Sequence, residues 1–187
     1  MGSNNLTMVY LDGEFKIAQY GHWDGYPKGQ GMTCLKFLRE MMDKEKFLNA
    51  LRNLSWISDE DISHLWESFG ADNIYKFNKR YPEYDRDTGA EILSLVQNGD
   101  VSKLENSIEF AANGLFCEWG WLIDFDSGTF EAYEGRDDRP LTEEDRFFFL
   151  RDKEENTGYH AIVKVAEWRL DDLPSEEDFL REFESKK

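Results

Sequence analysis

Gln19-Tyr20-Gly21-His22-Trp23-Asp24-Gly25-Tyr26-Pro27-Lys28-Gly29-Gln30-Gly31 combines four glycines, a proline, three aromatic residues, a histidine and an aspartate in thirteen positions. Glycine permits backbone conformations that other residues avoid, proline fixes one torsion angle, and the aromatic side chains fill space. An apolar, strand-like run precedes this stretch, and a helix-like run from Met32 to Met42 follows it. The stretch therefore predicts a loop with one required shape between a strand and a helix.

A hairpin is expected before this loop. Met8 to Leu11 and Glu14 to Tyr20 flank Asp12-Gly13, and Asp-Gly between alternating runs is a strong signal for a tight turn. In the second run, Phe15 and Ile17 share one face and Lys16 and Ala18 the other, as in a strand with one buried side.

Helical spacing of apolar residues dominates the middle of the chain. Ser58 occupies an expected N-cap position before Asp59-Glu60-Asp61, whose charges suit the positive end of a helix dipole, and Gly70 occupies the expected stop. The pattern predicts helices over residues 32–42, 58–70 and 88–96, with irregular structure from Tyr75 to Asp87. Residues 47–54 are expected to form either a second helix or a bent continuation of the first.

The pattern changes to strands after residue 115. An aromatic-rich run from Phe116 to Phe125 is followed by the turn Asp126-Ser127-Gly128 and a returning run from Thr129 to Glu134, which predicts a second hairpin. Further strands are expected at residues 147–150 and 159–165, and Ser175 is expected to cap a terminal helix.

These elements predict the α+β class. We expect residues 1–187 to form a single domain, with an antiparallel sheet built from the N-terminal and C-terminal hairpins and a helical middle segment packed on it.

The formal net charge of −17 is unevenly distributed along the chain. Residues 59–135 carry 17 Asp and Glu against 5 Lys and Arg, whereas residues 1–58 are close to neutral. An acidic surface repels phosphates, so no direct binding of nucleic acid is expected. The acidity has two open explanations, which are a coat that maintains solubility and a surface for a basic partner.

The sequence also suggests a compartment. It has no apolar run of the roughly 18 to 20 residues that span a bilayer, and residues 1–5 lack the features of a signal peptide. Cys34 and Cys117 are far apart and form no CxxC motif, which favours reduced thiols. We expect a cytoplasmic protein that does not contact membranes.

Two segments are similar to parts of a known protein family. Residues 19–31 (QYGHWDGYPKGQG) resemble a Q-Y-G-x-W-D-G-Y-P-x-G-x-G segment of a widespread, uncharacterised family whose members occur in phages and prophages. Residues 118–135 (EWGWLIDFDSGTFEAYEG) resemble its later W-x-x-x-I-D-x-D hairpin. The resemblance covers about a sixth of the chain and implies a shared fold without an established reaction. Acidic phage proteins of this size include inhibitors of host defence such as anti-CRISPR proteins.

The sequence contains partial signals for three kinds of chemistry: phosphate binding, metal binding and nucleophilic catalysis. The loop at residues 25–31 leads into a helix and could hold a phosphate, but it lacks two features of known phosphate-binding loops. These are the Gly-Lys-Ser/Thr ending of a Walker motif and the third glycine of a dinucleotide fingerprint. His22 and Asp24 with Asp124 and Asp126 form an incomplete set of metal ligands. A Cys–His dyad requires the fold to bring a cysteine to a histidine. We expect no cofactor and no metal.

The leading hypothesis is a binding protein. It is an acidic, phage-type inhibitor that binds a basic nucleic-acid-handling defence enzyme, for example a Cas nuclease such as Cas9, and whose carboxylates imitate the charge of DNA. The runner-up is a small hydrolase or nucleotide-binding protein with its site in the glycine-rich loop at His22, Trp23, Asp24 and Lys28. A structural or immunity-type protein, whose acidity only aids solvation, is the third. The carboxylates expected to contact the partner are Asp59, Glu60, Asp61, Asp85, Asp87, Asp137, Asp138, Glu143, Glu144 and Asp145.

Overall fold

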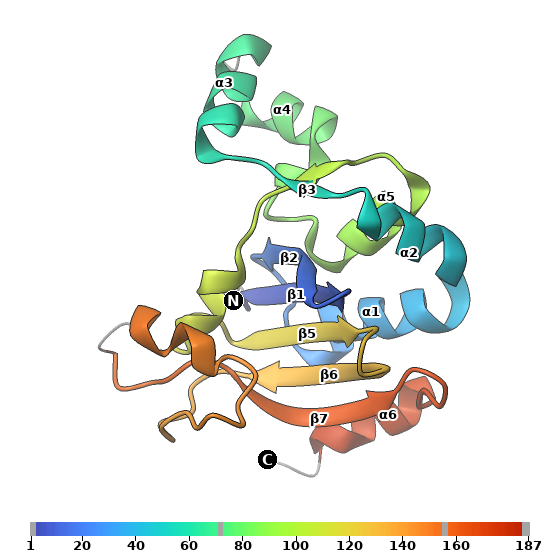
Figure 1. The fold of residues 1–187 in the computed structure, drawn as a ribbon, viewed down its shortest axis with the longest axis vertical. Coiled ribbons are helices and arrows are strands. Elements are labelled where there is room, and N and C mark those ends of the chain that lie inside the picture. The colour runs from blue at the N-terminus through green and yellow to red at the C-terminus, as the bar shows by residue number, and fades with distance from the viewer. Residues whose placement is uncertain (1–2, 71–72, 155–156, 185–187) are drawn as a thin grey trace.

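A five-stranded mixed sheet forms the centre of the protein, as seen in a computed structural model that describes residues 3–70, 73–154 and 157–184. The strand order is β2-β1-β5-β6-β7, so strands from both ends of the chain meet in one sheet (Figure 1). The strands are β1 (Asn5–Leu11), β2 (Glu14–Gly21), β5 (Trp119–Asp124), β6 (Thr129–Glu134) and β7 (Val163–Arg169).

Both predicted hairpins are present. Asp12 and Gly13 have φ angles of 54° and 79°, the left-handed pair that a two-residue turn between β1 and β2 needs. Residues 125–128 connect β5 to β6, with Gly128 at a φ of 71°. The local turn signals in the sequence therefore predicted these pairings correctly.

The expectation of an antiparallel sheet was wrong at one pairing. β1 lies parallel to β5, with Asn5 opposite Trp119 and Tyr10 opposite Asp124, while the other strand pairs of this five-stranded sheet are antiparallel. A parallel pair needs a long crossover connection, and the helical segment between β2 and β5 supplies it.

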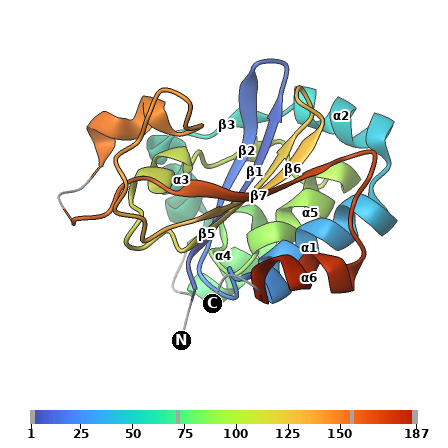
Figure 2. The ribbon, with the colours of Figure 1, turned by 90° about the horizontal axis from the view of Figure 1, so that it is seen from below.

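Helices cover one face of the sheet. α1 and α6 lie on the same side as α2 and α5 (Figure 2), and alternation along β5 directs Trp121 and Ile123 toward them. Ser175 caps the last helix as predicted, since its Oγ accepts a hydrogen bond from the Asp178 N–H at 3.1 Å. The bounds are α1 (Met32–Lys36), α2 (Lys44–Arg52), α5 (Ile92–Asn98) and α6 (Glu176–Glu184); helical turns at Pro27–Gly31 and Phe37–Met41 flank α1, and one at Gly89–Glu91 precedes α5.

The other face has a second, smaller core. Leu6, Met8 and Leu122 pack there against two helical turns, Ile108–Ala112 and Phe148–Lys153. The second turn overlaps residues 147–150, for which a strand was expected. A short apolar run fits either structure, and here no neighbouring strand pairs with it.

A helical hairpin projects from this body. α3 (Asp59–Phe69) and α4 (Ile74–Arg80) lie at one end of the molecule, connected to it near the two-stranded sheet of β3 (Ser55–Trp56) and β4 (Lys103–Leu104) (Figure 1). Ser58 and Gly70 begin and end α3 as predicted, with Ser58 Oγ accepting from the Asp61 N–H. The prediction of irregular structure over residues 75–87 was wrong for α4 and for the helical turn Pro82–Tyr84. Because only Phe77 of α4 is buried, the seven residues show no apolar periodicity.

Candidate functional site

The glycine-rich loop is fastened to the sheet by hydrogen bonds. The Gly25 N–H donates to the Ser3 carbonyl at 3.0 Å, and the buried Trp121 Nε1 donates to the Gly25 carbonyl at 2.8 Å. The Gln30 side chain connects the loop to the helical turn before α5, since it donates to the Trp23 carbonyl at 3.2 Å and accepts from the Ala90 N–H at 2.8 Å. These contacts hold the loop in one shape, as the sequence predicted.

Two of the loop glycines are required by close packing. A Cβ at Gly31 would lie 2.5 Å from the Trp121 ring, and a Cβ at Gly29 would lie 2.0 Å from the Asp24 carbonyl oxygen. Neither position has room for a side chain, so these glycines serve the packing of the loop.

The structure brings together only part of the site proposed for this loop: the His22 and Trp23 rings pack edge to face, with their centroids 4.5 Å apart. His22 Nδ1 lies 2.9 Å from the Tyr20 hydroxyl, Trp23 Nε1 donates to Asp87 at 2.8 Å, and Asp24 accepts from the Tyr26 hydroxyl at 2.9 Å. Lys28 lines a separate hollow of about 520 Å³, together with Tyr26, Pro27, Trp119, Glu134, Val165, Leu180, Phe183 and Glu184.

The two thiols are buried on opposite faces of the sheet. Burial raises the pKa of Cys34 to about 12, and burial also raises the pKa of Cys117. The thiolate is the nucleophilic form of cysteine, so both groups stay in the unreactive thiol form near neutral pH. Within the ranges that the structure describes, no three His, Cys, Asp or Glu side chains lie close enough together to hold a metal ion.

The fold places the predicted acidic residues in three separate regions. Asp59, Glu60 and Asp61 begin α3 on the projecting hairpin. Asp85 and Asp87 lie beside the glycine-rich loop, where Asp87 accepts from Trp23. The remaining five belong to the connection between β6 and β7, at the other end of the molecule from α3 (Figure 1): Asp137, Asp138, Glu143, Glu144 and Asp145.

A network of ions lies under this connection, on the face of the sheet opposite α1 and α6. Arg146 Nη2 donates to Asp124 at 2.6 Å and to Glu131 at 3.1 Å, and both carboxylates are almost fully buried, at 1% and 2% exposure. The Tyr133 hydroxyl donates to Glu131 and accepts from Arg146 Nε. Thr129 also donates to Glu131, at 2.8 Å.

The network perturbs the titration of its members. Burial alone would raise the pKa of Asp124, but hydrogen bonds from the Ser127 N–H and from Arg146 outweigh it and hold that pKa below its ordinary value. Burial, reinforced by the charge of Glu131, raises the pKa of Tyr133. Asp124 is therefore ionised and paired at neutral pH, while Tyr133 keeps its proton.

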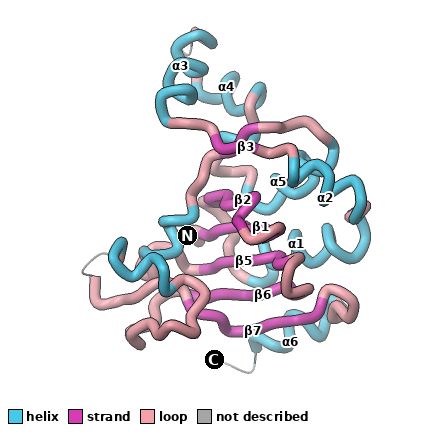
Figure 3. Tube along the Cα trace, viewed as in Figure 1, coloured by secondary structure: helices cyan, strands magenta, loops and turns pink. Residues whose placement is uncertain are grey.

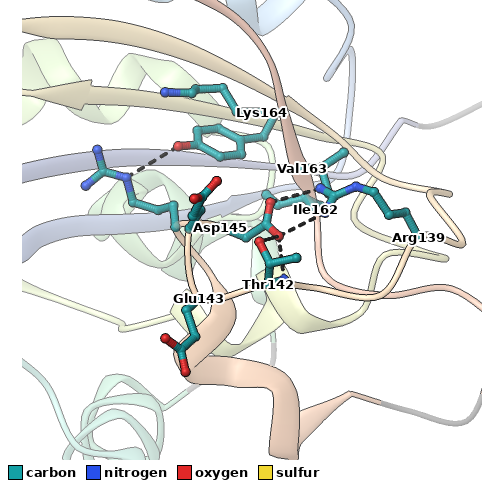
Figure 4. A pocket seen from close by; sticks show the side chains of 10 residues that line it. Arg139, Thr142, Glu143, Asp145, Ile162, Val163 and Lys164 are labelled. Atoms are coloured by element: carbon teal, nitrogen blue, oxygen red, sulfur yellow. Dashed lines mark hydrogen bonds and ion pairs between the residues drawn. The ribbon is translucent and has the colours of Figure 1, made fainter.

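A polar hollow of about 750 Å³ opens beside this network. The connection that forms it is mainly loop (Figure 3). Asp145 lies between Arg139 and Thr142 in Figure 4, while the Glu143 carboxylate points away from that group. The hollow is lined by Tyr133, Arg139, Thr142, Glu143, Glu144, Asp145, Arg146, Ile162, Val163 and Lys164.

Carboxylates neutralise each cation that lines the hollow. Arg139 makes two hydrogen bonds to Asp145, at 3.0 and 2.9 Å, which with those from Thr142 hold the pKa of Asp145 well below its usual range. Arg146 is paired with the network below, and Lys164 with Glu167. Glu143 and Glu144 have no ion pair among the described residues, which leaves two uncompensated negative charges at this hollow.

Sequence reasoning found the three acids of the hollow but missed Tyr133, Arg139, Arg146 and Lys164. One signal was available, since Thr129, Glu131 and Tyr133 recur with a period of two along a strand. A Glu between Thr and Tyr on one face of a buried strand requires a cationic partner. The pattern does not show that this cationic partner is Arg146.

Comparison with protein-family models, with curated proteins and with solved structures gave no match for this chain. Among the described helices, none is long and apolar enough to cross a membrane.

Proposed function

We propose that the protein acts by binding a basic surface of another protein, and that the hollow formed by residues 139–146 receives a lysine or arginine side chain of that partner. The observation that carries this proposal is the charge state of the hollow. Its three cations are already paired, whereas Glu143 and Glu144 have no ion pair with any residue that the structure describes.

The floor of the hollow adds to its negative field. Arg146 faces two buried carboxylates, Asp124 and Glu131, so this group carries one net negative charge when both are ionised. A cation that enters the hollow meets these charges with part of its hydration removed, where electrostatic attraction is stronger than in bulk water.

The net charge of −17 supports the same class of partner, because long-range attraction brings a basic protein to the surface faster than a neutral one. The resemblance of residues 19–31 to a segment of phage-associated proteins adds a specific candidate. The partner to test first is a nucleic-acid-handling defence enzyme, with a Cas nuclease such as Cas9 as the example, and the consequence of binding would be its inhibition.

A labelled arginine-rich peptide tests the hollow directly. Each exposed charge contributes up to roughly 1 kcal/mol, so Glu143→Gln with Glu144→Gln should weaken binding by about tenfold in a fluorescence anisotropy titration. The matched control, Glu176→Gln with Glu177→Gln on α6, makes the same change of charge away from the hollow. An equal loss in both variants would contradict a specific role for the hollow.

Salt dependence and an enzyme assay complete the test. Binding should weaken steeply between about 0.05 M and about 0.5 M salt, because screening shortens the range of the attraction. The Glu143→Gln, Glu144→Gln variant should also lose inhibition of purified Cas9 if that enzyme is the partner. Unchanged affinity at high salt would contradict binding driven by charge.

A second candidate function arises from the hollow beside Lys28. Lys28 has no ion pair among the described residues, and the same hollow is lined by aromatic rings that include Trp119 and Phe183. A cation next to half-buried rings suits a planar anion such as a nucleotide. Calorimetric titration with ATP and GTP tests this, and Lys28→Ala should abolish any binding, whereas Lys44→Ala should not.

A further inference from the structure

The two helices of the projecting hairpin carry opposite charges. α3 has four acidic residues and no lysine or arginine, and α4 has three basic residues and no acidic one. The residues are Asp59, Glu60, Asp61 and Glu67 on α3, and Lys76, Lys79 and Arg80 on α4.

These charges do not neutralise one another within the hairpin. Among the described residues, no ion pair joins α3 to α4, and the only ion pairs within α3 are those of His64 with Glu60 and Glu67, which exist only when His64 is protonated. The helices are instead held together by aromatic rings, with Phe77 packed against Trp66 at a centroid distance of 4.8 Å and against Phe69 at 5.7 Å. The charged residues of both helices are exposed.

The same hairpin exposes large apolar side chains. Tyr75 is 74% exposed and Ile74 is 58% exposed, and Phe69 is also exposed at the end of α3. Exposed apolar groups that adjoin unpaired charges are typical of an interaction surface.

We propose that this hairpin binds the hairpin of a second copy of the chain. In a two-fold arrangement, residues of α3 contact α4 of the other copy, and the same contact forms again with the roles exchanged. The acidic helix of each copy then meets the basic helix of its partner, and both pairs of charges are satisfied together. The exposed Ile74 and Tyr75 supply the apolar centre of the interface.

The size of the hairpin limits the strength of this contact. Two short helices from each copy form an interface below roughly 1,200 Å², the small end of the range for specific complexes. The net charge of −17 opposes association at long range. We therefore expect dimers only at high protein concentration.

Sedimentation equilibrium of the purified protein measures this association. The average mass should rise from 22.0 kDa toward twice that value as the concentration approaches about 1 mM. Lys76→Glu with Lys79→Glu should keep the protein monomeric, because every charged residue of the hairpin except Arg80 then has the same sign. Lys44→Glu with Lys46→Glu on α2 changes the net charge equally and should still dimerise more readily than the hairpin variant.

A mixing experiment separates pairing between helices from a general effect of charge. Glu60→Lys with Glu67→Lys makes the hairpin basic, so this variant alone should also be monomeric. An equimolar mixture with the Lys76→Glu, Lys79→Glu variant should form a heterodimer, because a basic hairpin then meets an acidic one. Circular dichroism of each variant checks that the helices are retained.

Two results would overturn the proposal. One is a wild-type protein that stays at 22.0 kDa at every concentration, which would leave a different macromolecule as the occupant of the hairpin. The other is a wild-type dimer that the hairpin substitutions do not affect, which would place the interface elsewhere. Since this experiment uses no basic partner, it is independent of the peptide-binding test of the hollow.

Discussion

The glycine-rich loop and the connection between β6 and β7 both contain residues that suggest chemistry, but they use them differently. In the loop, His22, Trp23 and Asp24 each have a hydrogen-bond partner within the protein, and the backbone is fixed by Trp121. In the connection, Asp145 is paired with Arg139, but Glu143 and Glu144 form no ion pair within the described part of the chain. The loop therefore holds the fold together, whereas the connection carries the two carboxylates that we propose for binding a basic partner.

The largest effect is expected where the connection meets the sheet. Arg146→Met removes the only cation that contacts Asp124 and Glu131 among the described residues, and breaking a buried ion pair in this way costs about 3–5 kcal/mol. Urea denaturation measures the loss of unfolding free energy.

The exposed pair of Arg169 with Asp171 gives a control. Arg169→Met should cost far less than Arg146→Met, because solvent screens that pair. Similar losses in the two variants would mean that the network contributes no more than an ion pair at the surface.

The second effect concerns the shape of the loop. Gly31→Ala places a Cβ within 2.5 Å of the buried Trp121 ring, which cannot move without breaking its hydrogen bond to Gly25. Overpacking of this kind costs about 1–3 kcal/mol, and thermal unfolding should show it as a lower midpoint. Lys28→Ala, on the surface of the same loop, should change stability by less than about 0.5 kcal/mol.

The third effect is a pH dependence of stability, with opposite sign for Asp145 in the connection and for Glu105 beside the start of the glycine-rich loop. The pKa of Asp145 is lowered in the folded protein by Arg139 and Thr142, so its contribution to stability is present above about pH 4 and is lost as the pH falls through its folded pKa. Asp145→Asn should therefore cost about 2 kcal/mol at neutral pH and progressively less in acid.

Glu105 should behave in the opposite way. It lines a small hollow beside Gln19 and Tyr20, and burial raises its pKa. A carboxyl with a raised pKa destabilises the fold at neutral pH, and this penalty disappears as the pH falls and the group binds its proton. Glu105→Gln should thus raise stability at neutral pH and have little effect near pH 4, about the pKa of a free glutamate. Denaturation at the two pH values checks both signs.

The smallest effect on stability is expected from the two unpaired acids. Glu143→Gln with Glu144→Gln should change the free energy of unfolding by less than about 0.5 kcal/mol, because neither side chain has an ion pair to lose among residues 3–70, 73–154 and 157–184. Together with the loss of peptide binding described above, this outcome would separate recognition from folding. A large loss of stability would instead mean that these carboxylates support the fold.

Local signals in the sequence predicted local structure well. Asp12-Gly13 marked the first hairpin and Ser58 the start of α3, because turn and cap chemistry acts over a few residues. The parallel pairing of β1 with β5 was missed, because alternation along a strand gives its buried face and not the identity of its neighbours. α4 was missed because Phe77 is its single buried residue.

The candidate site could be predicted only in part, for the same reason. The acids at residues 143–145 were identified from composition, but their pairing depends on the path of the chain. Arg139 pairs with Asp145 and neutralises its charge. No spacing rule in the sequence shows that Arg139 pairs with Asp145 and not with Glu143 or Glu144, which also line the hollow.

The parallel pairing has a consequence for how the chain reaches its fold during synthesis. The β1–β2 hairpin leaves the ribosome before its neighbour β5, which begins at Trp119. The Asp126 carboxylate accepts hydrogen bonds from the Asp12 and Gly13 N–H groups across more than a hundred residues. Contacts this distant in sequence close slowly. Nascent chains that end before β5 should therefore expose an unpaired edge of β1, which makes this stage of translation the most sensitive to aggregation and the one at which a chaperone would help most.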